Sequence, residues 1–281
     1  MHNEKNYLNL DKKVVKDFGS EWSQFDQSNL SEVDLREMYD GYFHIFPWEL
    51  LSSSAPGADI GCGSGRWALL VAPRVGHLYL IDPSNEALGV AQRNLKHVTN
   101  ISFLQEPVDN ISIKEASLDF AYSLGVLHHV PDTLAAIRSV SILLKPGAPF
   151  LIYLYYAFDH RPWWFRTLWC ASDFIRRTKS RLPFFLKRII CEVIAFFVYL
   201  PIARFALLVE KIGFRPHSLP LSYYRHRRFY VMRTDALDRF GTRLERRFNK
   251  AQIKDMLLSS GFSNIQFSYT QPFWCAVGIK E

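Results

Sequence analysis

The chain has 281 residues, of which 48% are hydrophobic and 22% are charged, and its formal net charge at pH 7 is +7. This composition excludes a disordered protein and is typical of one large globular domain, with or without an insertion. The four cysteines are scattered without a CxxC pair, which argues against a zinc site, and the polar amino terminus lacks an apolar signal core. We therefore expect a reducing, cytoplasmic location.

Residues 1–56 have mixed helix and loop patterns and are expected to form an amino-terminal helical cover. From residue 57 onward, apolar strand patterns alternate with helical patterns. The strand patterns lie at 58–61, 77–82, 100–105, 118–124 and 148–156, and the helical patterns lie at 65–72, 84–97 and 132–145. Such alternation predicts a doubly wound α/β domain with a mainly parallel sheet.

The alternation stops after residue 156 and resumes near the C-terminus. Residues 249–261 predict a helix, and 264–269 and 273–279 predict two strands that form an antiparallel hairpin at the sheet edge. The sheet should therefore have seven strands, with a helical insertion after the fifth. The expected domains are the cover 1–56, the sheet domain 57–156 with 249–281, and the insertion 157–248.

The insertion carries most of the positive charge. By count, residues 157–248 hold 19 Lys+Arg and 7 Asp+Glu, so their surplus is +12 and the rest of the chain is −5. A basic surface suits phosphates, anionic small molecules or the anionic surface of a membrane. A solvated surface without a partner fits the same charge, and both interpretations stay open.

A glycine-rich loop follows the first strand pattern, in the order Asp59-Ile60-Gly61-Cys62-Gly63-Ser64-Gly65. Glycine at alternate positions lets the backbone turn tightly and approach a ligand. Asp82 ends the next strand pattern, where a carboxylate can accept both hydroxyls of a ribose. A plain tight turn and an exposed aspartate are the alternatives for the two features.

The spacing and charge of this loop favour S-adenosylmethionine over a dinucleotide. A dinucleotide site prefers GxGxxG, whereas Gly65 here follows Gly63 by two residues. Asp59 stands where a phosphate would be repelled. A carboxylate at that place suits the sulfonium and ammonium groups of S-adenosylmethionine.

The motifs ADIGCGSGRWALLVAP, LYLIDPS, LDFAYSLGVLHHVPD and ILLKPGAPFLIYLYY resemble, in order and spacing, the class I S-adenosylmethionine-dependent methyltransferases. The resemblance covers about 55–156 and 249–281. It implies S-adenosylmethionine as the cofactor, S-adenosylhomocysteine as the product and no metal. The cofactor contacts that we predict are Asp59, Gly61, Cys62, Gly63, Gly65, Asp82, Pro83, Pro107, Val108, Leu124 and Gly125. Many relatives also hold the adenine amine with an acid after the third strand, and the sequence leaves open whether Glu106 or Asp109 does so.

The fourth strand pattern ends in Leu127-His128-His129-Val130-Pro131-Asp132, which resembles the small-molecule branch of the family. It does not resemble the DPPY or NPPY motifs of enzymes that methylate amino groups of nucleic acids and proteins. We expect His129, with His128 as second candidate, to deprotonate a hydroxyl acceptor, because the unperturbed pKa of histidine is near 6.5. The alternative is that both rings only pack beside the cofactor. The sequence thus favours O-methylation of a small molecule, lipid-linked or anionic, over a cofactor-binding protein without turnover and over nucleic-acid methylation.

Insertions after the fifth strand commonly cover the substrate in this superfamily, and FGSEWSQF at 18–25 resembles a segment of some bacterial relatives. Dense tyrosine and arginine suit an aromatic or anionic group that is stacked and clamped. The predicted substrate contacts are Trp22, Tyr156, Tyr223, Tyr224, Arg225, Tyr230 and Arg233. A helical subdomain with a solvated basic face is the alternative.

Residues 189–209 form an apolar stretch in which only Glu192 and Arg204 are charged. The stretch is long enough to cross a bilayer, but the chain would then have to return to its sheet through the membrane. Membrane-surface association through 176–214, on the inner face of a membrane, and burial within the helical insertion are the other interpretations. The sequence predicts no oligomeric state.

Overall fold

The computed structural model of the chain describes residues 9–27, 30–159, 161–179, 182–216, 219–241 and 244–281. These residues form two compact units. The sheet unit comprises Met1–Ser28, Leu35–Ala157 and Leu244–Glu281, and the helical unit comprises Asn29–Asp34 and Phe158–Arg243. Each unit is described by itself below.

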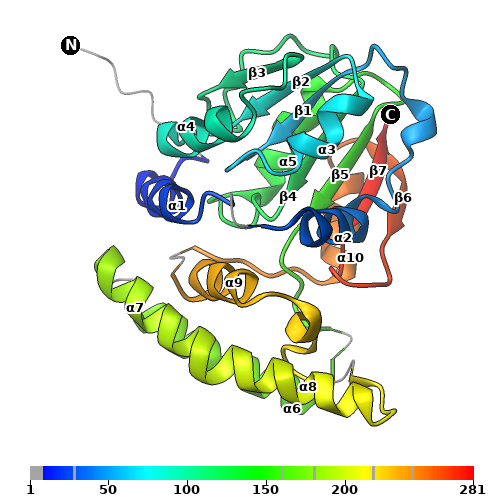
Figure 1. The fold of residues 1–281 in the computed structure, drawn as a ribbon. Coiled ribbons are helices and arrows are strands. Elements are labelled where there is room, and N and C mark those ends of the chain that lie inside the picture. The colour runs from blue at the N-terminus through cyan, green and yellow to red at the C-terminus, as the bar shows by residue number, and fades with distance from the viewer. Residues whose placement is uncertain (1–8, 28–29, 160, 180–181, 217–218, 242–243) are drawn as a thin grey trace. The chain divides into compact units, whose positions relative to one another are not determined.

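The sheet unit contains one seven-stranded sheet in the order β3-β2-β1-β4-β5-β7-β6 (Figure 1). The strands are β1 Pro56–Ile60, β2 His77–Ile81, β3 Ile101–Leu104, β4 Phe120–Leu124, β5 Pro149–Tyr153, β6 Phe262–Phe267 and β7 Ala276–Lys280. The first five strands are parallel, and β7 is antiparallel to both β5 and β6. The predicted doubly wound, mainly parallel sheet of seven strands is confirmed.

Several helices of this region are capped by short polar side chains. They are α1 Lys12–Gln24, α2 Glu32–Phe43, α3 Ala68–Val71, α4 Asn85–Asn94, α5 Thr133–Leu143 and α10 Lys250–Leu258. Ser84 caps α4, Asp132 caps α5, and Asn249 forms a capping box on α10, each by accepting a backbone N–H of the first turn. The predicted helix 65–72 is shorter in the structure, because its first residues belong to the glycine loop and a 3-10 turn at Ala72–Arg74 follows it.

The centre of the sheet is tightly packed. Every residue of β4 is buried, as expected for a central strand covered on both faces. A Cβ on Gly57 of β1 would lie 2.0 Å from the ring of Phe120, so only glycine fits beside that ring. The core therefore holds β1 and β4 in close register and fixes where both strands end.

The predicted C-terminal hairpin is an antiparallel pair with different strand limits. β6 begins at Phe262 and β7 begins at Ala276, so the connection is longer than the predicted turn at 270–272. Ser268 explains the early end of β6, because its hydroxyl bonds to Thr270 while its backbone N–H donates to the Cys275 carbonyl. Of these two strands, β6 lies at an edge of the sheet, whereas β7 is internal because it pairs with β5 as well.

The helical unit is built around one long helical run. Its elements are α6 Trp163–Lys179, α7 Phe184–Ile194, a π-helical turn η3 Ala195–Tyr199, α8 Leu200–Lys211, a 3-10 helix η5 Ser222–His226 and α9 Phe229–Gly241. α7, η3 and α8 follow one another without a break, as Figure 1 shows. α7 packs on α9, and α8 packs on η5. Among the described residues, Phe185–Lys211 is the one helix long and apolar enough to cross a membrane, by length and composition.

Candidate active site

The glycine loop follows β1 and is hydrogen-bonded to the carboxyl end of the neighbouring strand β2. The backbone N–H groups of Gly61 and Cys62 donate to the Ile81 carbonyl at 2.7 and 3.1 Å. Gly61, Gly63 and Gly65 have φ values of +77°, +53° and +73°, a region that favours glycine. The sequence thus has glycine at each position where the loop needs left-handed backbone.

Asp82 lies directly against this loop. One carboxylate oxygen accepts the N–H of Gly63 at 3.0 Å, and the other accepts the N–H of Ser84 at 2.9 Å. Burial raises the pKa of Asp82 to about 6, against the opposing effect of these two hydrogen bonds. The side chain is therefore fixed, and each of its oxygens keeps a lone pair for a further donor such as a hydroxyl.

Asp59 is a buried carboxyl in the middle of the sheet. It lies opposite Tyr122 of β4, whose hydroxyl donates to it at 3.0 Å. Burial raises the pKa of Asp59 to about 8, although the Tyr122 hydrogen bond lowers it. Within the described part of the chain neither Asp59 nor Asp82 is in an ion pair, so a cation bound beside them would favour their ionised forms.

Two side chains cover the glycine loop. A Cβ on Gly61 would lie 2.3 Å from Val126, and one on Gly63 would lie 2.9 Å from the ring of Trp22. The guanidinium of Arg66 lies over the Trp22 ring at 5.7 Å. Trp22, which we predicted to contact the substrate, thus lies with the predicted cofactor residues, and the sequence did not point to Val126.

The segment after β3 is also tied to the amino terminus. Pro107 and Val108 are buried, as a wall for adenine would be. Glu106 accepts the N–H of Ser112 at 2.8 Å, and Asp109 accepts the N–H of Asn9 at 3.0 Å. Both candidate acids for the adenine amine therefore already accept one backbone donor.

The carboxyl end of β4 leaves room beside the backbone. Gly125 has a φ of +79°, and among the described residues no atom outside Gly125 and its two chain neighbours lies within 4 Å of the place where its Cβ would be. Its N–H donates to the Tyr153 carbonyl at 3.1 Å, which ties it to β5, and the preceding Leu124 is buried. The backbone of this strand end is thus both fixed and accessible to a ligand.

His129 follows this strand end and has a defined tautomer. Its Nδ1 lies 2.6 Å from the Leu244 carbonyl, which can only accept, so Nδ1 carries the proton. In the neutral ring Nε2 then carries the lone pair. The ring of Phe18 lies 4.9 Å away and that of His128 lies 4.0 Å away, centroid to centroid.

His128 is fully buried and stacks on Tyr155 with the ring centroids 3.8 Å apart. Neither ring nitrogen has a hydrogen-bond partner among the described residues. Burial, His129 and Arg247 lower the pKa of His128 well below its usual value, so the ring is neutral. A buried neutral imidazole of this kind can orient a polar group of a ligand but is a poor base.

Residues 244–248 complete this region, and the sequence did not point to them. Arg246 donates its N–H to the His128 carbonyl at 3.1 Å, and Arg247 lies over the Tyr155 ring at 5.1 Å. Arg247 also pairs with Glu245 at 2.7 Å. The contacts of Arg246 with His128 and of Arg247 with Tyr155 join parts of the chain more than 90 residues apart, and no local pattern marks such pairs.

Five of the predicted substrate contacts lie in the helical unit, and three of them make side-chain hydrogen bonds within it. Arg233 makes two hydrogen bonds to Glu192, Arg225 donates to Glu210 at 2.9 Å, and the Tyr224 hydroxyl donates to Asp235 at 2.8 Å. Tyr223 packs edge-on against Tyr224, and Tyr230 lies in α9. Tyr156 lies in the sheet unit, in a bridge to Phe248. The structure therefore gathers only Trp22 and Tyr156 into the unit that holds the glycine loop.

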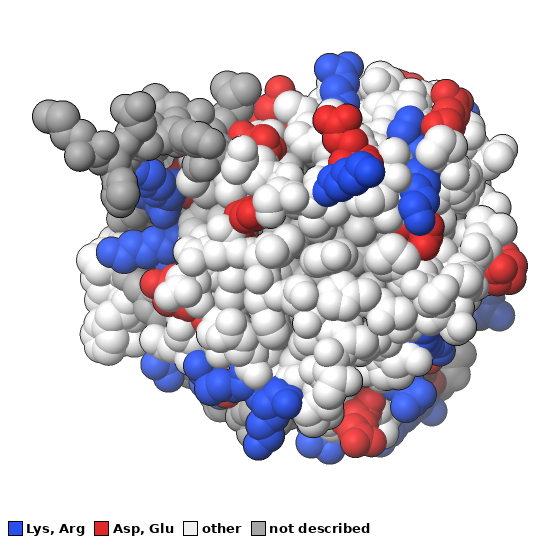
Figure 2. All heavy atoms as spheres, turned by 90° about the horizontal axis from the view of Figure 1, so that it is seen from above, with Lys and Arg blue, Asp and Glu red and all other residues white. Residues whose placement is uncertain are grey.

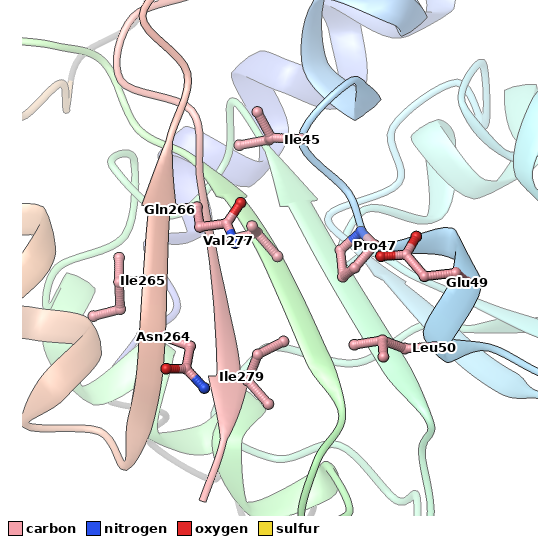
Figure 3. Close-up of a pocket in the computed structure, with 9 residues that line it drawn as sticks. All are labelled: Ile45, Pro47, Glu49, Leu50, Asn264, Ile265, Gln266, Val277 and Ile279. Atoms are coloured by element: carbon pink, nitrogen blue, oxygen red, sulfur yellow. The ribbon is translucent and has the colours of Figure 1, made fainter.

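A hollow of about 530 Å³ lies elsewhere on the sheet unit. It is lined by Ile45, Pro47, Glu49 and Leu50 and by β6 and β7 residues such as Gln266 and Val277 (Figure 3). β6 and β7 are at the far side of the sheet from β1 and β2. The hollow contains none of the residues predicted for the cofactor, so geometry and chemistry place the candidate site at the glycine loop.

The donor set at the loop fits S-adenosylmethionine. Asp82 offers free lone pairs for a ribose, Asp59 is a buried acid that a cation would stabilise, and Gly125 leaves space at a strand end. Among the described residues no three His, Cys, Asp or Glu side chains are grouped as for a metal ion. On the face in Figure 2, side chains of both signs lie mostly around the edge, so this face shows no block of one charge for nucleic-acid phosphates.

The comparisons with known proteins agree with this geometry. Residues 58–152 match the family described as "Methyltransferase domain". The ubiquinone biosynthesis O-methyltransferase of Paraburkholderia phymatum is 35% identical over 91 residues, which are 32% of this chain and 39% of that protein. The demethylmenaquinone methyltransferase of Staphylococcus saprophyticus is 28% identical over 100 residues, 34% of this chain and 43% of that protein. The chain thus matches about two fifths of the length of these relatives.

A solved S-adenosylmethionine-dependent methyltransferase of Thermotoga maritima has the same fold. Its TM-score is 0.51 at 13% identity, covering 94% of this chain and 100% of that one. The strand order and the antiparallel β7 described above are those of a Rossmann-like methyltransferase fold. With the glycine loop, Asp82 and the family match over 58–152, the chain contains a class I S-adenosylmethionine-dependent methyltransferase domain.

Proposed function

We propose that the chain transfers the methyl group of S-adenosylmethionine to an oxygen of a small aromatic acceptor that carries a lipid tail. The observation that carries this proposal is the set of rings at the carboxyl ends of β4 and β5. His129 has its Nδ1 proton on the Leu244 carbonyl and is bordered by Phe18, His128 and Tyr155. An aromatic acceptor would stack in such surroundings.

For this reaction the protein has to align the acceptor oxygen with the methyl group and remove one proton from the acceptor. The bound cofactor supplies an already activated methyl group with a neutral leaving group, so positioning accounts for much of the acceleration. A phenol attacks better after it loses its proton, and Nε2 of His129 has the lone pair to accept that proton. The neutral ring of His128 can hold the acceptor oxygen in place.

The names of the relatives support the acceptor class. One relative is named for ubiquinone biosynthesis and the other for demethylmenaquinone, and both compounds are quinones with apolar tails. One of these names specifies an O-methyltransferase, and the other does not name the atom. The preference for oxygen here rests on His129 and on that name.

Location belongs to the same proposal. The three buried cysteines Cys62, Cys191 and Cys275 are free thiols, as is the exposed Cys170. Free thiols, one of them exposed, suit a reducing compartment. We therefore assign the chain to the cytoplasm.

The proposal is tested by methyl transfer to a hydroxylated quinol with a short isoprenoid tail, in detergent micelles. The matched control is the same compound with its hydroxyl already methylated. A methoxy signal in the product spectrum, seen only with the free hydroxyl, is the expected result. A new ring methyl would contradict oxygen as the acceptor atom, and cofactor binding without any transfer would favour a non-catalytic, cofactor-binding role.

A further inference from the structure

The helical run Phe185–Lys211 has two unlike sides. One side is a buried stripe at spacings of three or four residues, made of Cys191, Ala195, Tyr199, Ala203 and Ala206. These mostly small side chains pack toward α9 and η5. Because an α-helix has 3.6 residues per turn, residues spaced by four shift gradually around its axis. The π-helical turn contains one extra residue, which offsets this shift and keeps the buried stripe on one side of the run.

The other side of the run, which we call the outer face, is exposed and apolar. Its side chains include Phe185, Ile189, Val193, Phe197, Phe205 and Leu208, and Phe185 and Phe197 are each 70% exposed. The exposed side of a helix in a soluble domain is normally polar. Single exposed apolar residues need no explanation, but a continuous exposed row along about 40 Å of helix marks an interaction surface.

The charges along this run are of one sign where they are exposed. Arg188, Arg204, Lys211 and Arg215 are exposed. The two acids of the segment form hydrogen bonds with basic residues of the helical unit. Glu192 bonds to Arg233, and Glu210 bonds to Arg225 and His226. The outer face is therefore apolar with basic residues at intervals, which matches the interface of an anionic lipid bilayer.

The same charges argue against a second copy of this chain as the partner. Two such faces would bring arginine and lysine of both copies together without acids to offset them. A spanning helix is also disfavoured, because β5 precedes the helical unit and β7, which follows it, pairs with β5. One crossing would require a return, and among the described residues no second helix is long and apolar enough.

We propose that the outer face of Phe185–Lys211 docks on anionic lipid, with the helix lying in the plane of the interface. Its aromatic and aliphatic side chains enter the acyl boundary, while Arg188, Lys211 and Arg215 contact headgroups. The proposal does not depend on methyl transfer. It holds or fails even if the acceptor is a water-soluble molecule.

The test is flotation of the full chain with vesicles of phosphatidylcholine alone and with about one third phosphatidylglycerol. We expect co-flotation with the anionic vesicles and little with the neutral ones. Phe185→Asp with Phe205→Asp should weaken partitioning about tenfold or more. The matched control is Leu50→Asp with Ile142→Asp, which changes two similarly exposed apolar residues of the sheet unit and should leave partitioning unchanged.

A second pair of variants tests the charges. Arg188→Gln with Lys211→Gln should weaken binding to anionic vesicles about tenfold, whereas Lys96→Gln with Lys254→Gln should not. Circular dichroism of every variant checks the fold. Equal flotation of the wild type and the Phe185→Asp/Phe205→Asp variant overturns the proposal. So does a concentration-dependent dimer that these two changes abolish, because the face would then bind a second copy.

Discussion

The two buried acids at the candidate site of the sheet unit and the acids of the helical unit have different partners, and the two units also differ in how much apolar helix surface they expose. In the sheet unit the acids Asp59 and Asp82 are drawn inward and hold only neutral partners, a tyrosine hydroxyl and two backbone N–H groups. In the helical unit acids meet arginines, as at Glu192–Arg233 and Asp173–Arg176. Apolar side chains also differ between the units. Strand β4 of the sheet unit is wholly buried, whereas one side of the α7–α8 run of the helical unit exposes its apolar side chains.

This contrast indicates where each unit binds something. A buried acid without a basic partner costs folding free energy, and proteins keep such groups mainly where a ligand stabilises them. An exposed apolar helix side is also costly, because its apolar surface stays in contact with water. We infer that the sheet unit binds a cationic small molecule, whereas the helical unit, whose acids are paired and whose exposed charges along the α7–α8 run are basic, binds an anionic surface with an apolar interior.

The largest effect is expected from Asp82. Asp82→Ala removes the carboxylate proposed to accept two ribose hydroxyls, and we expect cofactor affinity to fall about a hundredfold or more, since hydrogen bonds to a charged group contribute about 1.5–3 kcal/mol each. Isothermal titration measures it. The control is Asp119→Ala, which removes a sheet-unit acid paired with Lys145 and should leave affinity unchanged. Full affinity of the Asp82 variant would exclude it from the ribose site.

The next largest effect concerns turnover. We expect His129→Gln to lower kcat about a hundredfold while cofactor affinity stays within a factor of two or three, because general-base assistance is worth about 10²–10⁴. The pH profile separates this role from packing, because general-base catalysis makes the rate depend on the protonation state of the base and the variant should lose that dependence. His77→Gln is the control, as that histidine bonds Ser102 between β2 and β3. An unchanged profile would make His129 a packing residue.

A stability measurement addresses Asp59. Its pKa in the folded chain is about 8, above the ordinary value, so the folded state holds this proton up to higher pH. Stability therefore falls as the pH rises toward 8 and then levels off. Asp59→Asn keeps an acceptor for Tyr122 and has no proton to lose. We expect the variant to exceed the wild type by on the order of 5 kcal/mol in urea unfolding at pH 8.5 and to match it near pH 4. A constant difference would contradict the raised pKa.

The smallest effect lies in the helical unit. A double-mutant cycle with Glu192→Gln and Arg233→Met should give a coupling energy of about 1 kcal/mol, because the pair is bidentate and partly buried. The same cycle on the more exposed Lys145–Asp119 pair should give less. Equal couplings would show that the helical unit does not rely on its ion pairs more than the sheet unit does.

Local patterns predicted the sheet because its strands are apolar runs with clear stops. Gly57 and the glycines of the loop lie where the backbone must turn or approach a neighbour. The position of Asp82 beside the loop was predictable because it ends the next strand pattern. The parallel direction of the first five strands followed from the alternation with helices, whereas the strand order was not predicted. The seven-stranded fold was therefore predictable, while the limits of β6 depended on the side chain of Ser268.

The surroundings of the histidines were not predictable. The Leu244 carbonyl that fixes the tautomer of His129 is 115 residues away, and Asn9 bonds both to Asp109 and to the N–H of Asp132. In the insertion the composition suggested a substrate clamp, but Arg225 and Arg233 bond to acids of their own unit. Composition says that arginines are present and does not say which acids they meet. The assignments of individual site residues stay predictions.

The most direct test is isothermal titration of the full chain with S-adenosylmethionine at pH 7 in two buffers of different ionisation enthalpy. Because Asp59 has a pKa of about 8 in the free chain, a bound cation should drive off its proton. We expect micromolar binding with an observed heat that differs between the buffers, and a smaller difference for Asp59→Asn. Absence of binding, or binding with the same heat in both buffers, would contradict a cationic cofactor at the buried acids.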